Sequence, residues 1–131
     1  MDDKNDWEIP GSVTVWLGNL NSEAEFEAYL RENIDEDADI DAPLNQFAED
    51  IGFGFYDHDR QEAEYFGENL QIDKLIEPFS NSASFASEFA KAATSKGITT
   101  ADSAILLFDC QYRQNISAAA PMTFIGNFDY E

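Results

Sequence analysis

Residues 103–110 read Ser-Ala-Ile-Leu-Leu-Phe-Asp-Cys, and this apolar run determines which part of the chain forms the middle of a sheet. Successive side chains of an extended strand point to opposite faces of its sheet. A segment that is apolar at successive positions is therefore covered on both faces, which is typical of a central strand. The run predicts a central strand late in the chain.

Three other segments have strand patterns. Residues 12–17 read SVTVWL, with the two valines and the leucine on one face and Trp16 on the other. Residues 122–128 predict the last strand. Residues 60–66 alternate more weakly and carry several charges, which predicts an edge strand.

Four segments have helical patterns, at residues 22–32, 43–52, 70–76 and 81–97. The first begins with the capping-box pair Ser22 and Glu25, whose side chains satisfy each other's backbone donors. Pro43 opens the second helix, where its missing amide does no harm. Gly52 and Gly97 supply left-handed helix ends.

Strands at both ends of the chain with helices between them predict an α+β fold. We expect a single, mostly antiparallel sheet of about four strands with helices packed on a face. The length of 131 residues suits one domain with a substantial core. Residues 1–11 are mostly polar and end in a Pro-Gly turn signal, which predicts a disordered or frayed segment. Residues 12–131 are expected to form a single domain.

The chain carries a formal charge of −20, from 27 acidic and seven Lys or Arg side chains. Residues 1–66 hold 19 of the acids and three of the bases, so most of the excess lies in this half. Such a charge opposes binding to nucleic acid or to an anionic membrane and favours a basic partner. A second interpretation is that the charge serves only to keep the protein soluble.

The expected location is the cytoplasm. The one cysteine, Cys110, lies in an apolar run, so no disulfide framework exists and the thiol is expected to be buried. The first residues carry no basic and apolar signal pattern, and nowhere do eighteen apolar residues run together.

An acidic loop is expected between the first two helices, and its carboxylates alternate at Asp35, Asp37, Asp39 and Asp41. Alternation of this kind also suggests calcium. The sixth position of a calcium loop requires glycine and the twelfth a bidentate glutamate, but Ile40 and Gln46 occupy those positions when the loop begins at Asp35. A solvated acidic face is therefore preferred, and no metal or other cofactor is predicted.

The only histidine, His58, lies between Asp57 and Asp59 in the stretch FGFYDHD. Neighbours in an extended segment point to opposite faces, so these carboxylates cannot pair directly with the imidazole. Cys110 is the one thiol that could serve as a nucleophile, and its expected burial argues against that role. No phosphate-binding or nucleophile motif occurs, and no carboxylate pair stands out among the acids. The sequence therefore predicts a protein that is not an enzyme.

Several short segments follow one another between Val13 and Tyr130: VTVWLGN at 13–19, FEAYL at 26–30, FAEDIG at 47–52, YDHD at 56–59, AILLFD at 104–109 and FIGNF at 124–128. Their order and spacing are the basis of a resemblance to the bacterial immunity protein 22 family. It implies a protective protein from a polymorphic toxin locus, active in contact-dependent inhibition, that blocks a cognate toxin by tight binding.

Many toxin domains of such loci are nucleases with cationic grooves, so an acidic surface could occupy the groove in place of phosphate. The candidate contact residues are Asp35, Glu36, Asp37, Asp39, Asp41, Tyr56, Asp57, His58, Asp59, Glu62, Glu64 and Tyr65. Tyr56, Tyr65 and Phe66 are candidate aromatic anchors for the toxin. The alternative interpretation is that each packs in the hydrophobic core. Tyr56 to Asp59 could likewise organise the fold or border the surface.

Two other functions remain open: a DNA-mimic antirestriction protein and a small acidic adaptor. A DNA mimic should spread its acids over an elongated surface, and an adaptor should lack a single tight partner. The neighbouring gene discriminates among the three, because a toxin gene beside this one favours immunity and a restriction locus favours mimicry.

Overall fold

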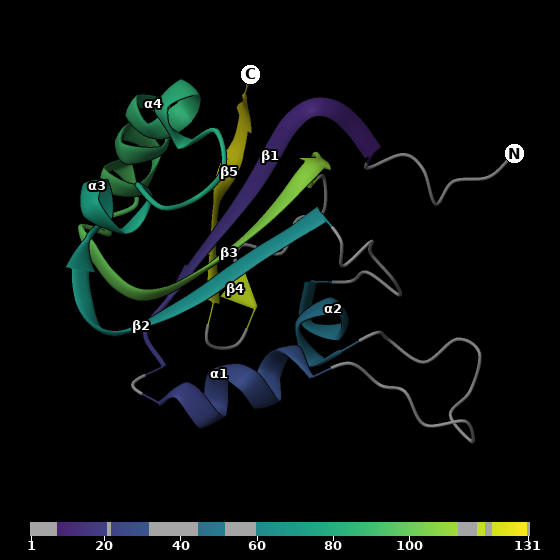
Figure 1. Ribbon diagram of the computed structural model, residues 1–131, viewed down its shortest axis with the longest axis vertical. Helices are drawn as coiled ribbons and strands as arrows, with labels where there is room; N and C mark the ends of the chain where they lie inside the picture. Colours follow the sequence, from purple (N-terminus) through teal and green to yellow (C-terminus); the bar gives the residue numbers. More distant parts are fainter. Residues whose placement is uncertain are drawn as a thin grey trace, which may run out of the picture.

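One antiparallel sheet organises the chain in the computed structural model, which describes residues 8–20, 22–31, 45–51, 60–112, 118–119 and 122–130. The strands are β1 (Glu8–Gly18), β2 (Gln61–Gln71), β3 (Thr100–Cys110), β4 (Ala118–Ala119) and β5 (Met122–Asp129). The helices are α1 (Glu23–Leu30), α2 (Gln46–Ile51), α3 (Ile72–Leu75) and α4 (Ser82–Ser95). The strand order is β2-β3-β1-β5-β4, with every neighbouring pair antiparallel (Figure 1).

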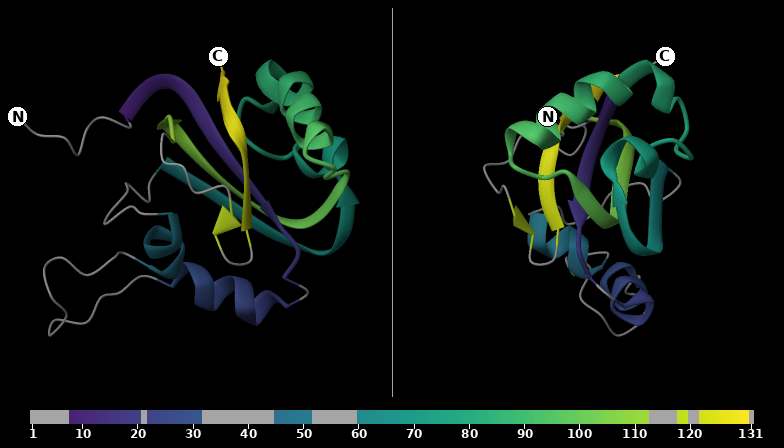
Figure 2. Two further views of the ribbon diagram at one scale, coloured as in Figure 1. Left: turned by 180° about the vertical axis from the view of Figure 1, so that it is seen from behind. Right: turned by 90° about the vertical axis from the view of Figure 1, so that its left-hand side faces the viewer.

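The predicted α+β fold is confirmed, with four long strands and the two-residue β4 added at one edge. The strand over residues 103–110 lies inside the sheet as predicted, since β3 pairs with both β1 and β2. One detail differs from the expectation of helices on a face: α3 and α4 cover one face of the sheet, and α1 and α2 pack against the other (Figure 2). The reason is that β1 and β3 are buried on both faces, so both need a cover.

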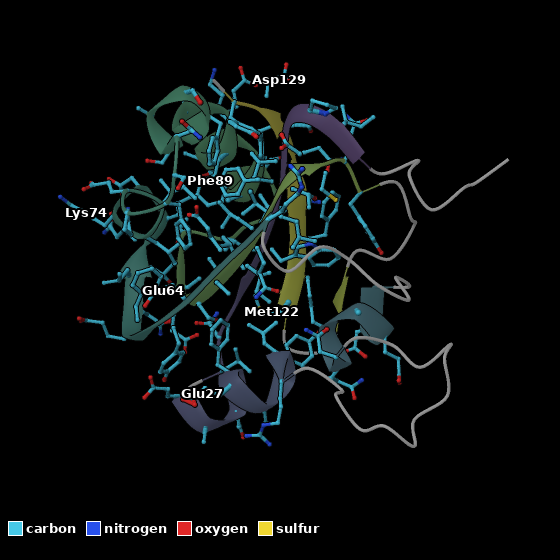
Figure 3. The ribbon with its side chains drawn as sticks, turned by 45° about the vertical axis from the view of Figure 1, so that its right-hand side comes forward. Glu27, Glu64, Lys74, Phe89, Met122 and Asp129 are labelled. Atoms are coloured by element: carbon cyan, nitrogen blue, oxygen red, sulfur yellow. The ribbon has the colours of Figure 1, made fainter. Side chains whose placement is uncertain are left out.

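The first core lies between the sheet and the pair α3 and α4. Val13, Val15 and Leu17 of β1 enter it on one side, as their alternation predicted. Phe85 and Phe89 of α4 enter it from the other, and Figure 3 shows Phe89 between the helix and the sheet. Phe89 is fully buried.

The second core is aromatic and centres on Trp16, the residue of β1 that was predicted to face away from the valines. Its ring lies 5.6 Å from that of Phe47 in α2, and 5.0 Å and 5.1 Å from those of Tyr112 and Phe124. Phe26 and Tyr29 of α1 complete this side. The fully buried Trp16 therefore joins the sheet to both N-terminal helices.

The start of β1 corrects the prediction for residues 8–11, which were expected to fray. These residues belong to the strand, because Glu8 pairs with Cys110 and the backbone amide of Gly11 donates to the Asp109 carboxylate over 3.0 Å. The register shifts between Glu8 and Val13, and Gly11 takes the left-handed φ of +84° that this irregularity requires. Residues 1–7 lie outside the described residues.

The edge position of β2 is confirmed, but the strand continues to Gln71 instead of ending near Phe66. Residues 61–65 pair regularly with β3, and the register then shifts before Leu70. Four residues, 66–69, stand opposite Asp102 alone, and Gly67 within them has a φ of +81°. Because the strand continues, the following helix, α3, begins at Ile72 and not at the predicted residue 70.

Helix caps match the sequence in part. The Ser22 hydroxyl accepts from the Glu25 amide over 3.3 Å, as the capping box predicted. The second helix is described from Gln46 and is capped by Asn45, while its predicted opening residue, Pro43, lies outside the described residues. Cys110 is half-buried, not buried as expected, because it lies near the end of β3.

Candidate functional site

The candidate contact residues divide between described and undescribed parts of the chain. Nine lie outside the described residues: Asp35, Glu36, Asp37, Asp39, Asp41, Tyr56, Asp57, His58 and Asp59. The remaining three, Glu62, Glu64 and Tyr65, lie on β2. The part of the site that the structure describes is therefore an edge strand and its surroundings.

Glu62 and Glu64 lie on one side of β2, as residues two apart in a strand must. They border a shallow hollow of about 300 Å³ between the strand and the turn after α3, lined by Gln61, Glu62, Ala63, Glu64, Pro78 and Phe79. The hollow thus combines two carboxylates from β2 with the apolar residues Pro78 and Phe79 of the turn. Its acidic side was predictable from the spacing in the strand, whereas Pro78 and Phe79 arrive from a distant element.

The two carboxylates have different surroundings. Glu62 accepts a hydrogen bond over 3.0 Å from the Ser80 amide and another from the Ser80 hydroxyl, so it orders the turn between α3 and α4. Glu64 is exposed and has no hydrogen-bond or ion-pair partner among the residues that the structure describes. A basic ligand at the hollow would find Glu64 available without breaking an internal bond.

Tyr65 lies on the opposite side of β2 from the hollow. Its ring lies 6.1 Å from that of Phe26 in α1, and it packs at the margin of the second core. Burial raises the pKa of Tyr65, and three nearby carboxylates raise it further. They belong to Asp102, Glu23 and Glu25.

The carboxylates near Tyr65 show that α1 contributes to the same acidic edge. Glu23, Glu25 and Glu27 are exposed, and α1 contacts β2 directly. Glutamates at the start of a helix are favoured by the positive end of its dipole, whatever the helix packs against. Their proximity to β2 depends on how α1 packs on the sheet, which the local pattern does not reveal.

Phe66 was a candidate anchor together with Tyr65, but the structure separates them. Phe66 packs against the first core, with its ring 6.3 Å from that of Phe79. The two aromatic side chains are therefore on opposite faces of the sheet. A partner that contacts both must reach around the edge of β2.

The start of β2 is fixed by a polar cluster around Asp109 at the end of β3. One carboxylate oxygen accepts hydrogen bonds from the Gly11 amide and the Tyr130 hydroxyl, and the other forms an ion pair with Arg60, the residue before β2. The hydrogen bond from Tyr130 and that from Gly11 hold the pKa of Asp109 below its ordinary value, and the Arg60 charge adds to this effect. The cluster joins four segments at one end of the sheet.

The described residues contain neither a cluster that could bind a metal ion nor a helix that could span a membrane. Within the described ranges, no group of three or more His, Cys, Asp or Glu side chains could hold a metal ion. No helix there is long and apolar enough to cross a bilayer. The acidic loop and His58 lie outside these ranges, so a solvated acidic face without calcium and a histidine without a catalytic role stay predictions.

The sequence profile of one family, immunity protein 22, matches residues 13–131, which include the whole fold except the first five residues of β1. The chain belongs to the immunity protein 22 family. The resemblance drawn from the sequence is thereby confirmed, and membership of this family gives the protein a toxin-immunity role with a toxin as its partner. No curated protein and no solved structure matches the chain significantly.

Proposed function

We propose that this immunity protein neutralises a basic toxin domain by stoichiometric binding in the cytoplasm, through the acidic surface formed around β2. In the described part of the chain this surface comprises the exposed glutamates of α1 and Glu62, Glu64 and Glu68 of β2. The acidic loop and residues 56–59 are proposed as further contacts. Binding, and not catalysis, accounts for the protection.

The observation that carries the proposal is that carboxylates from two elements flank the edge strand β2, those of α1 near one face of the sheet and those of β2 on the other. Glu23 and Glu25 of α1 act on the same Tyr65 hydroxyl from β2, and Glu64 lies exposed on that strand. These three glutamates belong to residues 1–66, which carry 19 of the 27 acids. An acidic edge of this kind is complementary to a cationic groove.

A nuclease is the class of toxin that fits best, because its groove is built to attract phosphate. Carboxylates can occupy such a groove and exclude the nucleic acid. Attraction between opposite charges would also speed association, to as much as about 10⁸–10⁹ M⁻¹s⁻¹ at low salt. Aromatic side chains at the centre, such as Tyr65, would set the residence time.

Co-expression with the toxin domain encoded beside this gene tests the proposal. We expect the immunity protein to restore growth, to co-purify with the toxin at a fixed ratio, and to associate more slowly as salt rises. Charge reversal at Asp37, Asp39 and Asp59 should slow association and flatten its salt dependence. Toxicity that persists without any complex would overturn the proposed function. Association rates that do not change with salt would overturn the role of the acidic surface in binding.

A further inference from the structure

The outer edge of β2 is a second feature of the same surface, and it concerns backbone groups instead of side chains. In the described part of the chain β2 pairs with β3 alone, and it occupies the end of the strand order. An edge strand directs every second backbone amide and carbonyl away from its sheet. These groups form a template on which another strand can pair.

The regular part of this template is short. Pairing with β3 is uninterrupted from Gln61 to Tyr65 and is followed by the four-residue irregularity that contains Gly67. Within this part, an added strand would follow residues 62–65, a length of roughly 14 Å. The irregularity at residues 66–69 interrupts the strand, so an added strand is not expected to continue beyond Tyr65.

Charge decides which strand can occupy this edge. Glu62 and Glu64 are side by side on one face of β2, and Glu68 lies exposed beyond them. A second copy of this chain would bring its own glutamates beside these, between molecules that each carry a formal charge of −20. Self-pairing is thereby opposed, whereas a strand with Lys or Arg at the facing positions gains attraction.

The hollow beside the strand supports the same occupant. Pro78 and Phe79 bring apolar groups to the hollow, next to Glu64. The stem of a lysine or arginine side chain is apolar and its head is charged, so it can lie along such a wall while the head reaches a carboxylate. The hollow and the strand edge are contiguous, because both include residues 62–64.

We propose that β2 binds an extended basic segment of the toxin as an added strand, with a Lys or Arg side chain in the hollow against Glu64. The inference rests on the proposed function, since it names the part of the toxin that this surface recognises. It differs from that function in requiring backbone pairing at residues 62–65, not merely attraction between charged surfaces.

Amide hydrogen exchange measured by NMR tests the backbone pairing, with the full chain free and in complex with the co-expressed toxin domain. Among residues 62–65, the amides that point to β3 are already paired, and the alternate amides point outward. We expect exchange of the outward amides to slow by at least about tenfold in the complex, in alternation along the strand. A complex that leaves these amides unprotected overturns the added strand and leaves the proposed function standing. Failure to form any complex overturns both.

A charge-reversal pair tests the facing lysine or arginine. Glu64→Lys and Glu88→Lys change the charge equally, and both residues are exposed, but Glu88 lies on α4 away from the hollow. We expect Glu64→Lys to raise the Kd for the toxin domain about tenfold more than Glu88→Lys does. Glu64→Gln should give a smaller increase in the same direction. Equal effects of the two reversals, or a dimer of the free protein in sedimentation, would overturn the assignment.

Discussion

Replacing Asp109 by Asn should lower the stability of the fold by removing one negative charge while keeping the shape of the side chain. The carboxylate accepts from the Gly11 amide over 3.0 Å and from the Tyr130 hydroxyl, and it pairs with Arg60. Asp109 has a left-handed φ of 55°, a conformation that Asn also tolerates, so the substitution adds no backbone strain. The change therefore isolates the electrostatic part of the cluster.

The expected loss is about 1–2 kcal/mol at pH 7. Hydrogen bonds to a charged acceptor contribute roughly 1 kcal/mol more than neutral ones, and two such bonds are weakened. The Arg60 pair adds only about 0.2–1 kcal/mol, because the Arg60 side chain is 45% exposed and solvent screens the interaction. The 27% exposure of the Asp109 side chain reduces the hydrogen-bond contribution as well, which keeps the total below the sum of the separate terms.

Urea unfolding of the wild type and the Asp109→Asn variant, as a function of pH, provides the assay. The folded pKa of Asp109 lies below its ordinary value, so its stabilisation is fully present above the unfolded pKa of about 3.9. It is lost as the pH falls through the lower, folded pKa. The difference in the free energy of unfolding between the two proteins should consequently be constant near neutral pH and become smaller in acid, below about pH 4.

A matched control is Asp129→Asn, which removes the same charge from an exposed residue at the end of β5. It should change the free energy of unfolding by no more than about 0.5 kcal/mol. If Asp109→Asn is no more destabilising than this control, or if its deficit widens in acid, the electrostatic account of the cluster is wrong. A double-mutant cycle with Tyr130→Phe should give a coupling energy of about 1 kcal/mol between the two side chains.

Three further substitutions test the packing and the caps, each by urea unfolding. Thr14 is fully buried and its hydroxyl has no hydrogen-bond partner among the described residues, so Thr14→Val should be neutral or stabilising by up to about 1 kcal/mol; a clear loss would reveal a hidden partner. Asn45 accepts from the Ala48 amide over 2.8 Å and donates to the Leu30 carbonyl over 3.2 Å. Asn45→Ala should therefore cost about 1–2 kcal/mol, and Asn45→Asp should cost less because Asp keeps the cap. Equal losses for the two variants would contradict the capping role. Phe89→Ala should cost about 3–5 kcal/mol, and a cost under 1 kcal/mol would place Phe89 outside the core.

The interior strands were predictable because their constraints are local. In β1 the alternation of Val13 and Val15 with Trp16 assigned each side chain to the correct face. The apolar run of β3 indicated burial on both faces, and residues 101–108 are buried throughout. Cover on both faces was already implied by this pattern, although the sequence did not show which helices supply it.

The candidate site was less predictable because it depends on contacts between distant residues. Glu62 and Glu64 share a side of β2 by simple alternation, but their neighbours Pro78 and Ser80 come from a turn after another helix. The cluster at Asp109 joins residues 98 positions apart in the chain. Charge and strand periodicity could therefore indicate an acidic edge, whereas the hollow beside it and the anchors at its end required the packed structure.

The position of the acidic residues follows from the way this sheet is buried. β1 and β3 are covered on both faces and cannot hold unpaired carboxylates without a large desolvation cost. At the edge, β2 has partly exposed side chains along most of its length, so glutamates can alternate there with residues that reach the two cores. In the described part of the chain, the same position leaves the outer side of residues 62–65 without a neighbouring strand. Negative charge and a strand edge therefore lie together, and this combination is the reason for proposing a basic strand as the ligand.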